Sequence, residues 1–178
     1  MTLRRNTFVN LFIGLVMILP LSACSIRMTM SGASIPDELK TVSVQYFANR
    51  APLINPTLSQ TFTEELKDRI TNESRLILKT GTGTSGTGDV DFSGEITDYN
   101  VRPMAIQADA LSAETRLTMA VKVRYRNFKN PKENWEQSFS AYEDFPSDQN
   151  INEVEEELVK LIVDNLTENI FNKAFANW

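Results

Sequence analysis

The stretch Arg116-Leu117-Thr118-Met119-Ala120-Val121-Lys122-Val123-Arg124-Tyr125-Arg126 alternates apolar and polar residues without interruption. A period of two residues predicts a β-strand with one face in the core and one face in water. The apolar face carries Leu117, Met119, Val121, Val123 and Tyr125. Because a half-buried strand needs a covering layer, this stretch predicts a sheet with other elements packed against one side.

The opposite face of this strand carries a basic row, which consists of Arg116, Lys122, Arg124 and Arg126. Two interpretations are open. The row could bind the phosphates of an anionic lipid or the acidic surface of a partner protein. Alternatively, this face is simply solvated, and acidic residues on a neighbouring strand, such as Glu136, neutralise it.

Two amphipathic helices are predicted on either side of the strand-rich middle of the chain. Asn55-Pro56 is typical of a helix start, and an apolar residue recurs every four positions up to an end near Asn72. Asn150 resembles the cap of a second helix, which carries a continuous apolar stripe to Phe175.

Four further stretches are predicted as strands: residues 41–47, 76–79, 90–101 and 134–142. In the first of them, Val42, Val44 and Tyr46 are expected on one face. Gly94 inside the third indicates a bulge or a close approach of another group. The order strand, helix, several strands, helix predicts one α+β domain over residues 39–178. We expect a two-layer sandwich with both helices on one face of the sheet.

The N-terminus predicts a lipoprotein signal peptide over residues 1–23. Arg4 and Arg5 precede a short apolar run, which falls below the roughly 20 residues that a membrane-spanning helix needs. Leu21-Ser22-Ala23-Cys24 is typical of a lipobox, so we expect diacylglycerol and an N-acyl chain on Cys24 and a tether over residues 24–38. The alternative is that Cys24 is an ordinary cysteine. Ser25 favours an outer-membrane anchor with the domain facing the periplasm.

Composition excludes several classes of function. The formal charge is −5, and cleavage before Cys24 removes two arginines and no acid, which takes it to −7. A nucleic-acid-binding protein needs a net basic footprint, so none is expected as a partner. The chain has no histidine, which removes the Ser-His-Asp and Cys-His schemes and most zinc sites. No cofactor is predicted.

Two weaker patterns in the sequence could indicate a metal site or a nucleotide site. Asp89 and Asp91 point to one side of a strand and could hold a metal, but a solvated strand face is the commoner explanation. Gly81, Gly83 and Gly86 match a dinucleotide fingerprint, yet a strand and not a helix follows them, which favours a hairpin loop. We therefore expect no enzyme. A tethered enzyme using carboxylates alone is kept as the third alternative.

Several segments resemble the lipopolysaccharide-assembly lipoprotein family, LptE, as a branch distant from its enteric members. They are the stretch from Thr41 through Asn55 to Gln60, Phe92-Ser93-Gly94-Glu95-Ile96, the Arg116-Leu117-Thr118 strand and the ending Ile170 to Trp178. The resemblance covers nearly all of the chain after Cys24. It implies two helices on one side of a four-stranded mixed sheet, whereas the sequence offers five strand candidates. One candidate is therefore expected to be short, peripheral or wrong, and residues 76–79 are the first suspect; five strands remain the alternative.

The resemblance also implies a function without catalysis. Family members stand inside a large outer-membrane β-barrel, as a plug that helps the barrel assemble and helps deliver lipopolysaccharide to the outer leaflet. Some members bind lipopolysaccharide through basic residues. The main alternative is a free-standing periplasmic carrier or chaperone for lipid or lipopolysaccharide.

Overall fold

The computed structural model describes residues 35–53, 55–79, 88–104 and 113–176. The elements, in chain order, are β1 (Thr41–Val44), β2 (Ala48–Asn49), α2 (Leu58–Glu73), β3 (Ile77–Leu78), β4 (Val90–Pro103), β5 (Glu114–Asn127), a short 3₁₀ helix (Pro131–Glu133), β6 (Trp135–Pro146) and α3 (Ile151–Phe175). The α+β class and the two helices agree with the prediction from the sequence.

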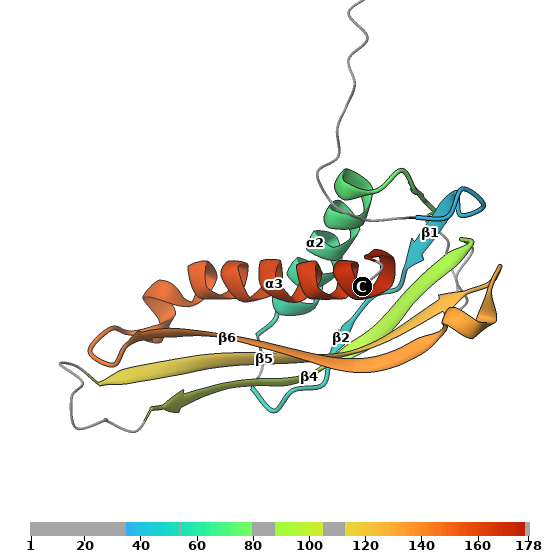
Figure 1. The fold of residues 1–178 in the computed structure, drawn as a ribbon. Helices are drawn as coiled ribbons and strands as arrows, with labels where there is room; N and C mark the ends of the chain where they lie inside the picture. Colours follow the sequence, from blue (N-terminus) through green and yellow to red (C-terminus); the bar gives the residue numbers. More distant parts are fainter. Residues whose placement is uncertain (1–34, 54, 80–87, 105–112, 177–178) are drawn as a thin grey trace, which may run out of the picture. The chain divides into compact units, whose positions relative to one another are not determined.

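The strands form one mixed sheet in the order β3-β1-β4-β5-β6, and β2 is joined separately to β4. β1 is parallel to both β3 and β4, and β2 is parallel to β4. β4, β5 and β6 are antiparallel neighbours and form the long part of the sheet (Figure 1). Within the described residues the sheet has six strands, more than the four that the resemblance implied and the five that the sequence offered.

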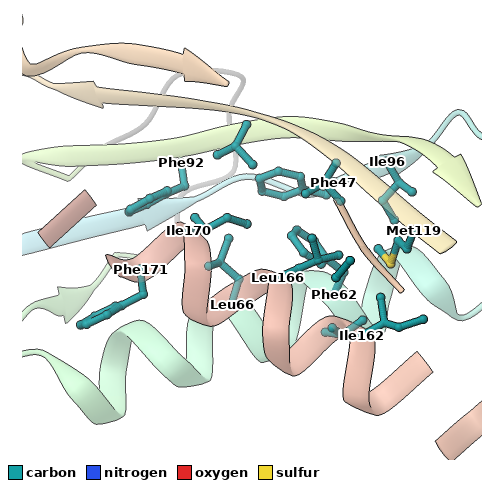
Figure 2. Close-up of a cluster of buried hydrophobic side chains, with 14 of the residues drawn as sticks. Phe47, Phe62, Leu66, Phe92, Ile96, Met119, Ile162, Leu166, Ile170 and Phe171 are labelled. Atoms are coloured by element: carbon teal, nitrogen blue, oxygen red, sulfur yellow. The ribbon is translucent and has the colours of Figure 1, made fainter. Parts of the chain in front are cut away.

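The alternation of β5 is confirmed by its burial. All five apolar residues of its inner face are almost fully buried, whereas Lys122, Arg124 and Arg126 are exposed. Figure 1 shows α2 and α3 on the same side of the sheet. The buried row of β5 belongs to a single apolar cluster with residues of both helices, and part of that cluster appears in Figure 2. Burial of this row removes apolar area from water, which stabilises the fold.

An asparagine side chain accepts backbone hydrogen bonds at both predicted helix starts. Asn150 is the N-cap of α3 as predicted, whereas α2 begins at Leu58 with Thr57 as its N-cap residue, two positions after Asn55. The Asn55 Oδ1 atom accepts hydrogen bonds from the N–H groups of Thr57 and Leu58, at 3.0 and 3.1 Å. The Asn150 Oδ1 atom accepts one from the N–H of Asn152, at 3.1 Å. These bonds satisfy N–H groups that have no partner within the helix. A cap of this kind stabilises a helix by typically about 1 kcal/mol.

The predicted strand at residues 41–47 is interrupted, which corrects one expectation about its inner face. β1 ends at Val44 and β2 begins at Ala48, and Tyr46 is 64% exposed instead of lying in the core. Phe47 is buried in its place, and its N–H donates to the Thr63 hydroxyl of α2 at 3.1 Å. Between Val44↔Phe92 and Ala48↔Glu95 the chain advances by four residues while β4 advances by three. This one additional residue shifts the alternation by one position, which the periodicity of the sequence did not reveal.

The segment 76–79 is short and peripheral, as the sequence led us to expect, and it is part of the sheet. The N–H of Ile77 donates to the Lys40 carbonyl at 2.9 Å, and that of Lys79 donates to the Val42 carbonyl at 2.8 Å. Leu76, just before β3, is buried. These contacts make β3 a short border strand parallel to β1.

Gly94 of β4 lies where a buried aromatic ring crosses the strand. A Cβ atom at this position would lie 2.0 Å from the Lys122 carbonyl oxygen and 2.7 Å from the Phe47 ring. Phe47 in turn packs edge-on against Phe62 of α2, with ring centroids 5.0 Å apart. The prediction of a close approach at Gly94 is confirmed. The register shift of β4 lies further along the strand, between Ile96 and Asp98.

We predict that Gly94→Ala destabilises the protein by about 1–3 kcal/mol or more, the range typical of overpacking a tight site. The added methyl group must displace either the backbone of β5 or the Phe47 ring. Urea denaturation followed by circular dichroism measures the change in the free energy of unfolding. Ser93→Ala is the matched control on the same strand, and it should change stability by less than about 0.5 kcal/mol. Equal stability of the two variants would contradict this account of the packing.

Candidate functional site

The four predicted site residues of β5 lie together on the face of the sheet that points away from α2 and α3. We call this surface the open face; it carries Arg116, Lys122, Arg124 and Arg126 of β5 with their neighbours on β4 and β6. The two-residue alternation of β5 puts them there, because the residues between them fill the core. The structure therefore confirms that they form one row. It also shows that most of the row is paired with acidic residues of β6.

Arg116 makes the best-defined contact on the open face. Its Nε and Nη2 atoms donate to the two carboxylate oxygens of Asp144, at 2.7 and 2.8 Å. Its guanidinium carbon also lies 3.5 Å from the centre of the Tyr142 ring. The hydrogen bonds from Arg116 lower the pKa of Asp144 below its usual range. A two-pronged pair stacked on an aromatic ring fixes the direction of the guanidinium, which leaves it less free to bind a ligand.

Lys122 and Arg124 share one acidic partner, Glu136 of β6. The Lys122 Nζ atom and the Arg124 Nε atom each lie 2.7 Å from a different carboxylate oxygen. Hydrogen bonds from Lys122 and then Arg124 lower the pKa of Glu136. The expectation that Glu136 neutralises part of the basic row is thus confirmed. The second carboxylate near these two cations belongs to Glu95 of β4, which lies opposite Lys122 in the strand register.

Arg126 differs from the other three residues of the row. Its register partner on β4 is Asp91, but among the described residues no acidic group lies within 4 Å of its guanidinium. Asp91 is only 3% exposed and accepts hydrogen bonds from the Ser43 hydroxyl at 2.7 Å and the Gln45 amide at 3.0 Å. Arg126 is therefore the member of the row whose charge is least compensated.

The open face contains a further cation that the sequence did not single out. Arg102 near the end of β4 lies directly opposite Arg116 in the β4–β5 register. Like charges in this position repel each other, and Asp144 on the far side of Arg116 offsets the repulsion. Only the strand register brings Arg102 to this place, so no local sequence pattern could have indicated it.

A shallow hollow of about 270 Å³ lies on the open face between the three long strands. Its lining residues are Ser93, Gly94, Glu95, Lys122, Arg124 and Glu136. Two cations and two carboxylates line it, so its formal charge balances. An anionic group would have to displace Glu136 from Lys122 and Arg124 to bind there. The hollow alone is therefore not a ready-made phosphate site.

The two candidate carboxylates of residues 89 and 91 are engaged in contacts within the fold. The Asp89 Oδ2 atom accepts hydrogen bonds from the N–H groups of Lys40 and Thr41, both at 3.0 Å, and from the Thr41 hydroxyl at 2.9 Å. Asp91 is held separately by Ser43 and Gln45. Across the ranges that the structure describes, no three histidine, cysteine, aspartate or glutamate residues gather as metal ligands would.

Three predictions lie outside the described residues: the signal peptide of residues 1–23, the lipidation of Cys24, and the loop from Gly81 to Gly86. In the part of the chain that is described, no helix is both long and apolar enough to cross a membrane.

The fold and the open face together define a class of protein, a small α+β domain with an exposed, charged sheet surface. The match to a family model is specific. Residues 39–174 match the model of LptE, described as lipopolysaccharide-assembly, and the chain belongs to this family. No curated protein matches the chain.

Solved structures with low sequence identity resemble this chain. A hypothetical protein from Chlamydia trachomatis is 13% identical, with 78% of this chain and 99% of that chain covered and a TM-score of 0.55. A protein described as a neuraminyllactose-binding hemagglutinin homolog from Helicobacter pylori is 10% identical, with 83% and 89% covered and a TM-score of 0.54. A minor lipoprotein from Acinetobacter baumannii is 15% identical, with 76% and 91% covered and a TM-score of 0.49.

We predict that the Asp89 carboxylate stabilises the fold at neutral pH and that this contribution is lost in acid. The hydrogen bond from the Lys40 N–H, aided by Thr41 and Lys129 and opposed by burial, lowers the pKa of Asp89 from 3.8 to about 2. A lowered pKa in the folded state means that the stabilisation is complete above pH 4 and disappears as the pH falls through 2.

The test compares Asp89→Asn with the unchanged protein by urea denaturation between pH 6 and pH 2. At pH 6 the variant should be less stable by about 1.5–3 kcal/mol, the scale of hydrogen bonds to a charged group. The difference should shrink between pH 4 and pH 2. Asp148→Asn, in the exposed turn before α3, should show no such dependence. A difference that stays constant down to pH 2 would contradict the prediction.

Proposed function

We propose that this protein is a non-catalytic lipoprotein of the outer membrane, anchored through Cys24 and facing the periplasm. In this role it partners and plugs the β-barrel that inserts lipopolysaccharide, helps the barrel to assemble and helps deliver lipopolysaccharide to the outer leaflet. The observation that carries the proposal is the family match over residues 39–174. The match runs through the whole described domain and is not confined to one motif.

The N-terminal sequence supports the anchor. Cys24 is the one cysteine of the chain and stands at the end of a lipobox that follows a short apolar run. Each buried methylene group contributes about 0.8 kcal/mol, so two or three acyl chains hold a protein on a membrane almost irreversibly. A protein tethered by its first mature residue can meet a membrane-embedded partner without a spanning helix of its own.

The open face supports binding of an anionic ligand, although with less available charge than the sequence suggested. Asp144 and Glu136 occupy Arg116, Lys122 and Arg124 in part, and Arg126 stands apart from these pairs. Surface ion pairs contribute only about 0–1 kcal/mol each, so a phosphorylated lipid can replace a carboxylate as the partner of these cations. The carboxylates considered for catalysis hold β1 and β4 together, which supports a role without catalysis.

We predict that the full-length lipidated protein, extracted from outer membranes in mild detergent, brings down a large β-barrel protein in near equal amount. Mass spectrometry identifies the bound chains. Cys24→Ala removes the acylated thiol, so this variant should be lost from the membrane fraction and should recover far less barrel. Recovery of the lipidated protein with lipid alone would reject the plug and favour the free-standing carrier.

We predict that changing Lys122, Arg124 and Arg126 together to Ser weakens lipopolysaccharide binding roughly tenfold, since three partly compensated surface charges contribute about 0.2–1 kcal/mol each. The salt dependence of binding should weaken too, because fewer cations remain to exchange counter-ions. A charge-matched control changes Lys67, Lys132 and Lys160, which lie outside the open face. Titration with labelled lipopolysaccharide at two salt concentrations measures both effects. Equal loss in both triple variants would exclude the row as a specific site.

A further inference from the structure

The sheet has two borders, and one of them carries features that prevent pairing with another strand. At this border β3 has only two residues, and β2 pairs with β4 only as far as Ile96. Beyond that point β4 is interrupted by the register shift before Asp98 and ends at Pro103. Short strands, bulges and prolines are the means by which proteins block the edge of a sheet.

The other border, β6, is neither short nor interrupted by a register shift. Its residues pair with β5 without a register shift from Trp135↔Tyr125 to Pro146↔Glu114. Its one proline is the last residue, and the strand contains neither lysine nor arginine. Within the described ranges no strand pairs with its outer side (Figure 1). β6 is thus a regular edge of twelve residues that is open to another strand.

The backbone groups that point outward can be identified from the ladder. The N–H of Ser147 donates to the Ala113 carbonyl at 3.0 Å, which continues the β5–β6 ladder by one pair. Because groups along a strand alternate between its two sides, the odd-numbered residues of β6 face β5. The outward N–H and C=O groups therefore belong to Glu136, Ser138, Ser140, Tyr142 and Asp144. All five of these residues are exposed.

We propose that the outer edge of β6 binds an extended segment of the barrel partner by adding it to the sheet as a further strand. The inference rests on the proposed function. The wall of a closed barrel has no free edge, so the segment must be a loop or a chain end that enters the lumen. Strand addition suits such a segment because the affinity comes from main-chain hydrogen bonds, whereas the side chains on alternate positions provide selectivity.

The side chains beside the edge favour this occupant over others. On the helix side, Trp135 and Phe139 are half-buried with ring centroids 5.9 Å apart, so apolar residues at alternate positions of the added strand would pack against them. β6 carries Glu136, Glu143 and Asp144 and no cation. A second copy paired antiparallel about Ser140 would place Glu136 opposite Asp144, which is unfavourable. A neutral or basic segment has no such conflict.

The test removes outward backbone donors without touching the ladder to β5. Ser138→Pro and Ser140→Pro each delete one outward N–H, and proline is tolerated on an edge strand where its nitrogen faces solvent. In the full-length lipidated protein, the double proline variant should retain about tenfold less barrel, as expected for the loss of two main-chain hydrogen bonds. Ser138→Ala with Ser140→Ala keeps both amides and should retain barrel normally.

A second measurement does not depend on proline. Cys24 is acylated in the proposed protein, so Ser140→Cys supplies the one free thiol, and a short thiol-to-lysine crosslinker should join it to the barrel. Lys160→Cys on the exposed side of α3 should not crosslink. Equal barrel retention by the proline and alanine variants, with no crosslink from position 140, would reject the outer edge of β6 as the binding site. The proposed function as a barrel plug would not be affected by this result. Absence of barrel from the unchanged protein would overturn both.

Two other outcomes would identify a different occupant. If the isolated protein is a dimer by light scattering and the proline variants are monomeric with barrel retention unchanged, the edge pairs with a second copy. If the proline variants lower the melting temperature of the isolated protein by more than about 10 °C, a segment of the same chain covers the edge. Either result would reject the barrel segment as the strand that β6 accepts.

Discussion

The burial of one face of β5 is the constraint on which the rest of the structure depends. Its five apolar residues lie in one cluster with both helices and with β1 and β4. In a strand of period two, a slip of one residue would move Lys122 and Arg124 into that cluster and Val121 and Val123 into water. The cost of burying unpaired cations is large, so the register of the whole β4–β5–β6 unit is fixed by this one pattern. The helices then have a single side on which to pack.

The charges of the open face follow from the same register. Because β5 is central and antiparallel to both long neighbours, Arg116, Lys122 and Arg124 lie opposite residues of both β4 and β6, whereas Arg126 lies beyond the β5–β6 register and opposite Asp91 of β4. The acids of β6 stand beside Arg116, Lys122 and Arg124, whereas Asp91 on β4 is turned to Ser43 and Gln45. The row that the sequence presents as four equal cations is therefore unequal. Its paired members are fixed in direction, and Arg126 keeps the least compensated charge.

The sequence predicted the elements that carry their own periodic signal. β5, α2 and α3 each show a repeated apolar pattern, and both asparagine caps stand at the start of such a pattern. β2 and β3 have two residues each and carry no period, so only contacts with residues far away in the chain define them. The break after Val44 also depends on distant contacts. Phe47, and not Tyr46, turns inward, because its N–H donates to Thr63 of α2 and its ring packs beside Gly94. The pairing of Glu136 could be foreseen as an opposite charge on the next strand, whereas Arg102 could not, because its place depends on the bulge in β4.

The two surfaces proposed as binding sites, the open face and the outer edge of β6, would bind through different physics. The open face offers side-chain charges in water, and interactions of that kind weaken as salt screens them over a Debye length of about 8 Å at physiological ionic strength. The outer edge of β6 offers backbone donors and acceptors, whose strength depends on alignment with a partner strand and little on salt.

The side chains of Glu136, Tyr142 and Asp144 belong to the open face, and their backbone groups belong to the outer edge of β6. A strand added at the edge would lie beside these acids and hold them in place against the cations of β5, so occupancy of the edge and binding at the face should influence each other. Linkage requires that influence to be reciprocal, whichever surface is occupied first.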